Sequence, residues 1–166
     1  QSLRHGPFEC MYTRTTGIWQ TVWMEAVAPT GIQRVKYVTD IDRSIVTMEF
    51  QMRRNATGNT LTVNIKDGQK IIASETGKIA SGSMFSLPIK KAKLWSPESP
   101  FLYDVEFILK DAEGHVIDQV SSYFGMRKIH TEGNRIYLNN EPYYQRLVLD
   151  QGFYPDGVWT APSDAA

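Results

Sequence analysis

The chain has 166 residues, and its 18 Lys plus Arg balance 18 Asp plus Glu, so it is long enough for one domain with additional segments. A formal charge of zero argues against a nucleic-acid backbone or an anionic membrane as the main partner, because both select an excess of basic side chains. Apolar runs of at most three residues are far shorter than the ~20 that a membrane helix needs, and the single cysteine excludes an intrachain disulfide or a cysteine-cluster metal site.

The first 30 residues predict one strand, at 18–27. Its tryptophans alternate with Val22 and Met24, so that both faces of the strand are apolar. Such a strand must be covered on both sides, and residues 1–30 contain nothing else that could cover it.

Between about residues 32 and 125, apolar residues alternate with polar ones, which is typical of strands with one buried face. Seven strands are predicted, at 35–41, 45–53, 60–66, 71–73, 85–89, 101–110 and 116–124. The side chains expected in the core are Val46, Met48, Phe50, Leu61, Val63, Ile65, Tyr103, Val105 and Phe107. Seven short strands in this span predict an all-β fold, an immunoglobulin-like antiparallel β-sandwich, with another antiparallel sandwich or barrel as the alternative.

Turn residues separate these strands. Residues 55–59 (Asn-Ala-Thr-Gly-Asn) and 111–114 (Asp-Ala-Glu-Gly) are each expected to close a hairpin. Asp67-Gly68 is expected to form a two-residue hairpin loop, since Asp and Gly tolerate positive φ.

The composition changes after about residue 129. Residues 134–138 and 143–149 predict a further hairpin, closed by a turn at 139–142. The final four residues, Ser-Asp-Ala-Ala, are typical of a helix N-cap and first turn. We therefore expect the chain to be a piece of a longer polypeptide.

Three separated stretches resemble glycoside hydrolase family 2. Residues 16–25 (TGIWQTVWME) are similar to the closing strand of the family's sugar-binding jelly-roll domain. Residues 94–103 (LWSPESPFLY) resemble the LWSPExPxLY crossover of its immunoglobulin-like second domain. Residues 124–129 (FGMRKI), followed by 136–142 (IYLNNEP) and Arg146, are similar to the FGFRKI…LNGKPxxLRG passage into its catalytic barrel.

This resemblance implies three domain assignments: residues 1–30 end the jelly roll, 31–129 form the sandwich, and 130–166 begin a truncated (β/α)8 barrel. The parent enzyme would hydrolyse β-glycosides with retention, most of all β-galactosides, through two glutamates on late barrel strands. This chain does not reach those strands, so we expect it to be inactive alone and its sandwich to be a structural spacer. The partners implied are a carbohydrate substrate and the neighbouring domains of the same chain, and a homo-oligomer is compatible with the sequence. A glycan-degrading parent favours a periplasmic or extracellular compartment over the cytoplasm, although the sequence does not decide it.

One wall of the parent's sugar site is expected after the first barrel strand, because barrel active sites lie at the C-terminal ends of the strands. Asp150 and Gln151 follow that strand, and Gln151 stands where the family's RGVNRHE motif has a His that borders the sugar. We expect both side chains to bind sugar hydroxyls and Trp159 to stack on the sugar. The alternatives are that Asp150 and Gln151 only order the loop and that Trp159 packs against other barrel loops.

The remaining polar residues form no recognisable site. The three histidines lack zinc spacing, and Asp40-x-Asp42 is far short of a calcium loop, so neither metal nor cofactor is expected. Trp95 is expected to cap the sandwich core rather than stack on sugar. The rival interpretation is a stand-alone β-sandwich that serves as a carbohydrate-binding or adhesion module without catalysis.

Overall fold

The computed structural model describes residues 17–18, 21–54, 56–149, 152, 154, 160–163 and 165. The chain divides into two compact units, one of which is Ala26–Gln145 and the other Gln1–Glu25 with Arg146–Ala166. Across the described residues, no helix has the length and apolarity needed to cross a bilayer.

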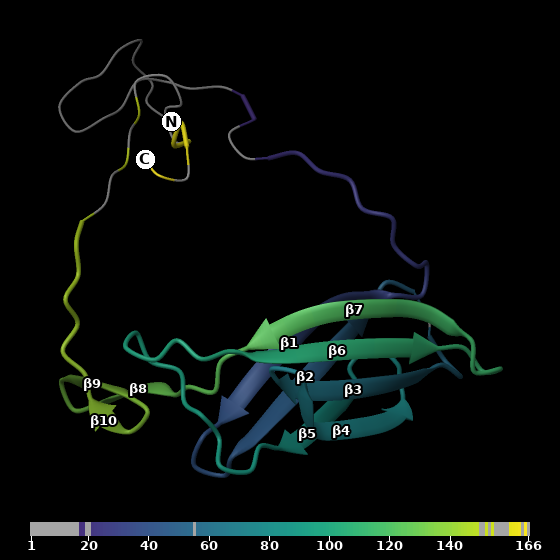
Figure 1. The fold of residues 1–166 in the computed structure, drawn as a ribbon, viewed down its shortest axis with the longest axis horizontal. Helices are drawn as coiled ribbons and strands as arrows, with labels where there is room; N and C mark the ends of the chain where they lie inside the picture. Colours follow the sequence, from purple (N-terminus) through teal and green to yellow (C-terminus); the bar gives the residue numbers. More distant parts are fainter. Residues whose placement is uncertain are drawn as a thin grey trace. The chain divides into compact units, whose positions relative to one another are not determined.

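In the described part of the chain, the strands form three antiparallel sheets (Figure 1). They are β1 (Ile32–Asp40), β2 (Ile45–Met52), β3 (Thr60–Asp67), β4 (Lys70–Lys78), β5 (Met84–Pro88), β6 (Tyr103–Lys110), β7 (Val116–Phe124), β8 (Ile129–Glu132), β9 (Arg135–Leu138) and β10 (Glu141–Pro142). One sandwich sheet has the order β1-β2-β5, the other β4-β3-β6-β7, and a small third sheet has the order β10-β9-β8. Strands β1 to β7 correspond to the seven predicted strands, so the all-β immunoglobulin-like fold is confirmed.

The core lies between the two sandwich sheets. All nine side chains predicted for it are buried, with at most 2% of their surface exposed. The Phe50 ring meets Phe85 and Phe107 edge-on, at centroid distances of 5.5 Å and 5.2 Å. Because Phe85 belongs to the sheet of β2 and Phe107 to the facing sheet, Phe50 joins the two layers.

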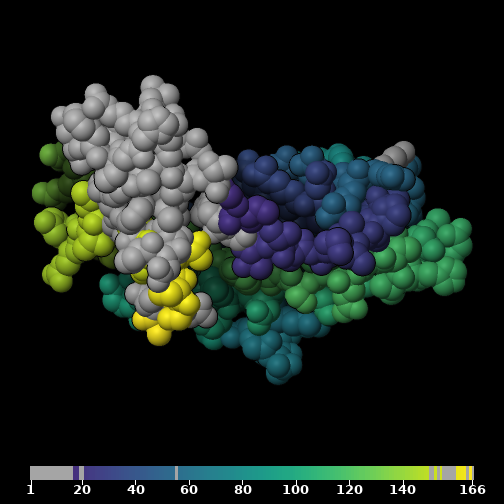
Figure 2. All heavy atoms as spheres, turned by 90° about the horizontal axis from the view of Figure 1, so that it is seen from above, coloured from purple at the N-terminus to yellow at the C-terminus, as the bar shows by residue number. Residues whose placement is uncertain are grey.

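Strands β1 and β7 lie side by side although they belong to different sheets. The Tyr37 hydroxyl donates to Ser122 Oγ at 2.8 Å, and the Tyr37 ring stacks on Phe124. Figure 2 shows the green atoms of β7 on the side of the sandwich that also carries the dark blue atoms of β1. Burial raises the pKa of the Tyr37 phenol, so this hydroxyl stays protonated and can donate at neutral pH.

A polar network crosses the outer face of the four-stranded sheet. The Glu106 carboxylate on β6 accepts hydrogen bonds from Asn64 Nδ2 at 3.2 Å and Gln119 Nε2 at 2.8 Å, and it pairs with Lys66 Nζ at 3.1 Å. Asn64 Oδ1 in turn accepts from the Ser74 hydroxyl at 2.7 Å. One carboxylate thus links all four strands of this sheet.

Two of the predicted turns need correction. The connection between β2 and β3 is not a hairpin, because β2 pairs with β1 and β5 whereas β3 pairs with β4 and β6. Two facing sheets require such crossings, which local turn chemistry cannot reveal. The β3–β4 loop is Gly68-Gln69, one residue later than predicted, since Asp67 pairs with Lys70 and Gly68 takes the positive φ. The β6–β7 hairpin at residues 111–114 is confirmed.

Both flanking strand predictions are wrong for the described residues. Residues 21–28 form no strand, and Trp23 and Met24 are 72% and 99% exposed. Residues 143–149 also form no strand, so the predicted hairpin reduces to β9 and the two-residue β10, and the sequence did not predict β8. A strand needs a ladder of hydrogen bonds to a neighbouring strand. In the described part of the chain, these two segments show one such bond, from the Tyr143 amide to the Ile136 carbonyl.

Candidate functional site

The three predicted sugar-binding residues, Asp150, Gln151 and Trp159, lie outside the described residues. Their roles therefore remain predictions. Residues 143–145, which follow β10, belong to the unit that contains the sandwich.

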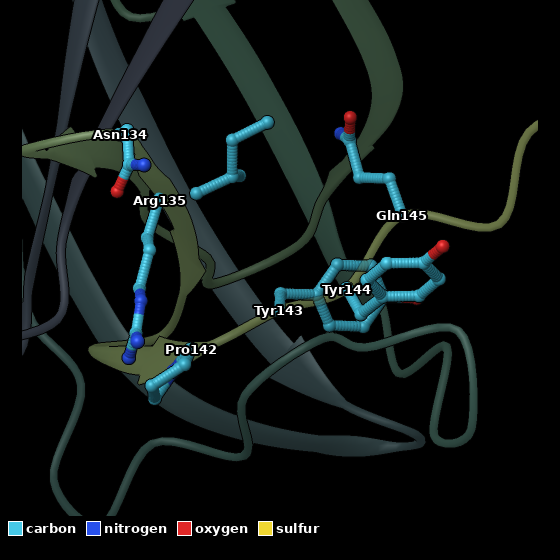
Figure 3. Close-up of a pocket in the computed structure, with 7 residues that line it drawn as sticks. Asn134, Arg135, Pro142, Tyr143, Tyr144 and Gln145 are labelled. Carbon is cyan, nitrogen blue, oxygen red and sulfur yellow. The ribbon is translucent and has the colours of Figure 1, made fainter.

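These residues line a hollow beside the small sheet, with a volume of about 420 Å³ (Figure 3). Its lining residues are Asn134, Arg135, Ile136, Pro142, Tyr143, Tyr144 and Gln145. The Tyr143 amide donates to the Ile136 carbonyl at 2.8 Å, which extends the β9–β10 pairing by one residue. In Figure 3, Asn134 and Arg135 lie on one side of the hollow and the two tyrosine rings on the other.

The hollow offers aromatic rings, amides and a guanidinium, but no Asp or Glu is among its described lining residues. Glycoside hydrolysis by the usual mechanism requires a pair of carboxyl groups. The hollow therefore lacks the groups for this chemistry. Within the described residues, moreover, no cluster of three or more His, Cys, Asp or Glu side chains is placed to hold a metal ion.

A second feature is the contact between the small sheet and one end of the sandwich, which we call the junction: Asp42, Trp95, Lys128, Asn139 and Asn140. Asp42 belongs to the β1–β2 turn and accepts from Lys128 Nζ at 2.5 Å and from Asn140 Nδ2 at 2.7 Å. Two hydrogen bonds lower the pKa of the Asp42 carboxyl below its usual value. The bond from Lys128 has the larger effect and the bond from Asn140 the next largest. Asp42 is therefore ionised at neutral pH and holds both donors.

Asn139 provides the other half of the junction. Its Oδ1 accepts from the Lys128 amide at 3.1 Å, its Nδ2 donates to the Trp95 carbonyl at 2.9 Å, and its own amide donates to the Lys128 carbonyl at 2.8 Å. One side chain thus satisfies a backbone donor and a backbone acceptor from two other segments.

The β9–β10 turn requires an unusual backbone. Leu138 pairs with Glu141, so Asn139 and Asn140 form a two-residue loop, with φ values of +54° and +69°. Loops of this kind with both φ values positive favour Asn and Gly, which adopt that conformation at low cost. Asn140 stands where the LNGKP motif has Gly, and its side chain adds the contact with Asp42.

Trp95 packs against the segment after β7. Its amide donates to the Met126 carbonyl at 2.9 Å, and the Arg127 guanidinium lies 4.8 Å from the ring centroid. A Cβ on Gly125 would lie 3.1 Å from Trp95 Cβ, so the close approach of the tryptophan favours glycine here. These contacts support the expected structural role of Trp95.

Sequence reasoning missed the junction. It considered Asp42 only as a metal ligand, and it used residues 139–142 only as a turn and, with Lys128, as part of a family-like passage. The two consecutive asparagines of a two-residue loop were a usable signal, because either could have been glycine if backbone conformation were their only purpose.

Together, the two sheets and the junction define a structural module, an immunoglobulin-like sandwich fastened to the small sheet at its C-terminal end. The chain matches the family model of glycosyl hydrolases family 2 over residues 30–127. It belongs to that family.

The relatives of this chain include enzymes named for two different activities. The chain is 25% identical over 130 residues to a β-glucuronidase of Paenibacillus borealis, a match that covers 77% of this chain and 21% of that protein. It is also 25% identical over 146 residues to a β-galactosidase of Lactococcus lactis subsp. lactis, covering 86% of this chain and 14% of that protein. The chain therefore spans about a fifth or less of the length of these relatives.

A solved β-D-glucuronidase structure from Dictyoglomus thermophilum resembles this chain with a TM-score of 0.57 and 24% identity. The match covers 69% of this chain and 18% of that protein. At this level of identity, the likeness shows the fold.

Proposed function

We propose that this chain is the central module of a retaining family 2 glycoside hydrolase and that its sandwich is a structural spacer between the segments on either side. The observation that carries the proposal is the junction, because Asp42 and Asn139 bind the small sheet, which opens the predicted barrel segment at 130–166, to the sandwich. A spacer must hold its neighbours in a defined position. A stand-alone binding module would have no need of such an attachment at its exit.

We propose β-glycosides as the substrates of the longer enzyme, and β-galactosides in particular. Both activity names among the relatives support a β-glycoside. Asp150 and Gln151, the predicted sugar contacts, include no cation. Since like charges repel in a desolvated site, Asp150 disfavours the carboxylate of a glucuronide and leaves the neutral galactoside as the better ligand.

The test uses the longer protein encoded by the gene from which this sequence comes. We expect it to hydrolyse an aryl β-galactoside faster than the matching β-glucuronide. Asp150→Ala and Gln151→Ala should each lower kcat/KM by about 30- to 1,000-fold, the equivalent of about 2–4 kcal/mol for a hydrogen bond that tightens in the transition state.

Glu132→Ala is the control, because Glu132 is exposed at the end of β8, and the Tm of each variant must match that of the wild type. If both site variants keep kcat/KM within about threefold of the wild-type value, Asp150 and Gln151 only order their loop. Polysaccharide binding without any turnover by the wild type would favour the stand-alone module instead.

A further inference from the structure

The β9–β10 turn combines two properties that need not occur together. Both of its residues have positive φ, and both side chains bond to the end of the sandwich. Glycine would satisfy the first property as well as asparagine does. The asparagine side chains at these two positions therefore point to a second purpose, which is attachment.

The Asn139 side chain binds two backbone groups, and each of them needs a hydrogen-bond partner. The Lys128 amide and the Trp95 carbonyl each bond to one atom of the same side chain. A backbone group that loses its partner in a partly buried place costs free energy until water reaches it. The asparagine side chain carries an acceptor and a donor on two separate atoms, so it can satisfy both backbone groups at once.

The attachment at Asn140 adds a charged acceptor. Asp42 receives both Lys128 Nζ and Asn140 Nδ2, and His130 is the other titratable group whose charge acts on it. Lys128 contacts Asn139 through its backbone and Asp42 through its side chain. The two attachments therefore share one residue and are expected to be energetically coupled.

The small sheet also sets the direction in which the chain leaves the β9–β10 turn. Pro142 pairs with Tyr137, and the Tyr143 amide still bonds to the Ile136 carbonyl, so the chain is held in the sheet up to Tyr143. Asp150 is only ten residues beyond Asn140. A rotation of the small sheet against the sandwich would therefore move the start of the segment that leads to Asp150.

We propose that Asn139, Asn140 and Asp42 are positioning residues: through the junction they orient the small sheet, and with it the chain that leaves Tyr143 toward the proposed glycosidase site. This proposal rests on the proposed function. The three residues touch no substrate. Their effect on catalysis is to hold the entry to the barrel at one angle, because a displacement of about 1 Å at a reacting group can cost 100-fold in rate.

The first experiment needs only the 166-residue chain. Asn139→Gly and Asn140→Gly keep a residue that suits positive φ while removing the attachment, and Gln69→Gly, in the exposed β3–β4 loop, is the matched control. We expect amide hydrogen exchange in β8, β9 and β10 to be about 3- to 10-fold faster in both asparagine variants, as one lost hydrogen bond implies, and unchanged in the control. Exchange in the sandwich strands should not change. Equal exchange in all four proteins would overturn the junction's role.

The second experiment uses the longer enzyme. Asn139→Gly and Asn140→Gly should lower kcat by about tenfold with KM within twofold of the wild-type value and with Tm unchanged, because bound substrate would meet a misplaced catalytic wall. Asn139→Asp keeps the acceptor for the Lys128 amide and should restore part of kcat. Wild-type kcat in both glycine variants would overturn the positioning role. A wild-type enzyme without glycosidase activity would instead overturn the proposed function, while the exchange experiment still decides whether the junction holds the small sheet.

Discussion

Glu106→Gln tests whether the polar network on the four-stranded sheet stabilises the sandwich. The carboxylate uses both oxygens: Oε2 faces Asn64 and Lys66, and Oε1 faces Gln119. Glutamine keeps the shape of the side chain but offers only one acceptor oxygen, so at least one donor will face an amide NH₂ group.

The magnitude can be worked out from the hydrogen bonds lost. A hydrogen bond to a charged acceptor contributes about 1.5–3 kcal/mol, and the lower end applies because solvent reaches part of the network. We therefore expect Glu106→Gln to lower the free energy of unfolding by about 2 kcal/mol at pH 7. That is roughly 8 °C in Tm for a domain of this size.

The assay is urea denaturation of the 166-residue chain at pH 7 and at pH 3. Glu113→Gln is the matched control, because Glu113 lies exposed in the β6–β7 turn and should change the stability by less than about 0.5 kcal/mol. A Glu106→Gln variant as stable as this control at pH 7 would refute the role of the network.

The stabilisation that Glu106 provides should decrease as the pH falls. Hydrogen bonds from Asn64, then Lys66, then Gln119 lower the pKa of the Glu106 carboxyl. A lowered folded-state pKa contributes stability that is complete above the unfolded value of about 4.3 and is lost as the pH falls through the folded value. The stability difference between wild type and variant should therefore be largest at pH 7 and shrink below about pH 4. A difference that stays constant down to pH 3 would contradict this reasoning.

Three further predictions concern the core, the tryptophan contact and activity. Phe50→Ala should destabilise the chain by about 3–5 kcal/mol because it leaves a cavity between the two sheets, whereas Phe50→Leu should cost clearly less in the same urea titration. Gly125→Ala should cost about 1–3 kcal/mol, since the added Cβ would lie 3.1 Å from Trp95 Cβ, 3.2 Å from its Cγ and 3.3 Å from its Cδ1; Trp95→Ala in the same chain removes the last two of these atoms and should relieve part of that loss if the close contact is its cause. The purified 166-residue chain should not hydrolyse aryl β-galactosides or β-glucuronides above background, because the family's catalytic glutamates are expected on later strands; turnover that copurifies with the chain and disappears when one of its own glutamates is changed would contradict this.

The strands of the sandwich and their buried faces could be assigned from the amino-acid sequence alone. Strand alternation is a local property with a period of two residues, so Val46, Met48 and Phe50 could be assigned to the core without knowing their partners. The class of domain could also be predicted from short family-like stretches, because a motif such as LWSPESPFLY is contiguous in the chain.

The pairing of the strands and the contacts between distant polar side chains depend on how the whole chain folds. Strand β2 pairs with β5 rather than with β3 because the two sheets must face each other across one core. The flanking segments at 21–28 and 143–149 have apolar residues suited to strands but form none, since hydrogen-bonding neighbours are a property of the assembled fold. Asp42 and Asn140 are 98 residues apart in sequence, and each looks like an ordinary turn residue in its own segment. Their contact exists because folding brings the β1–β2 turn and the β9–β10 turn to the same end of the sandwich, a juxtaposition that no local pattern encodes.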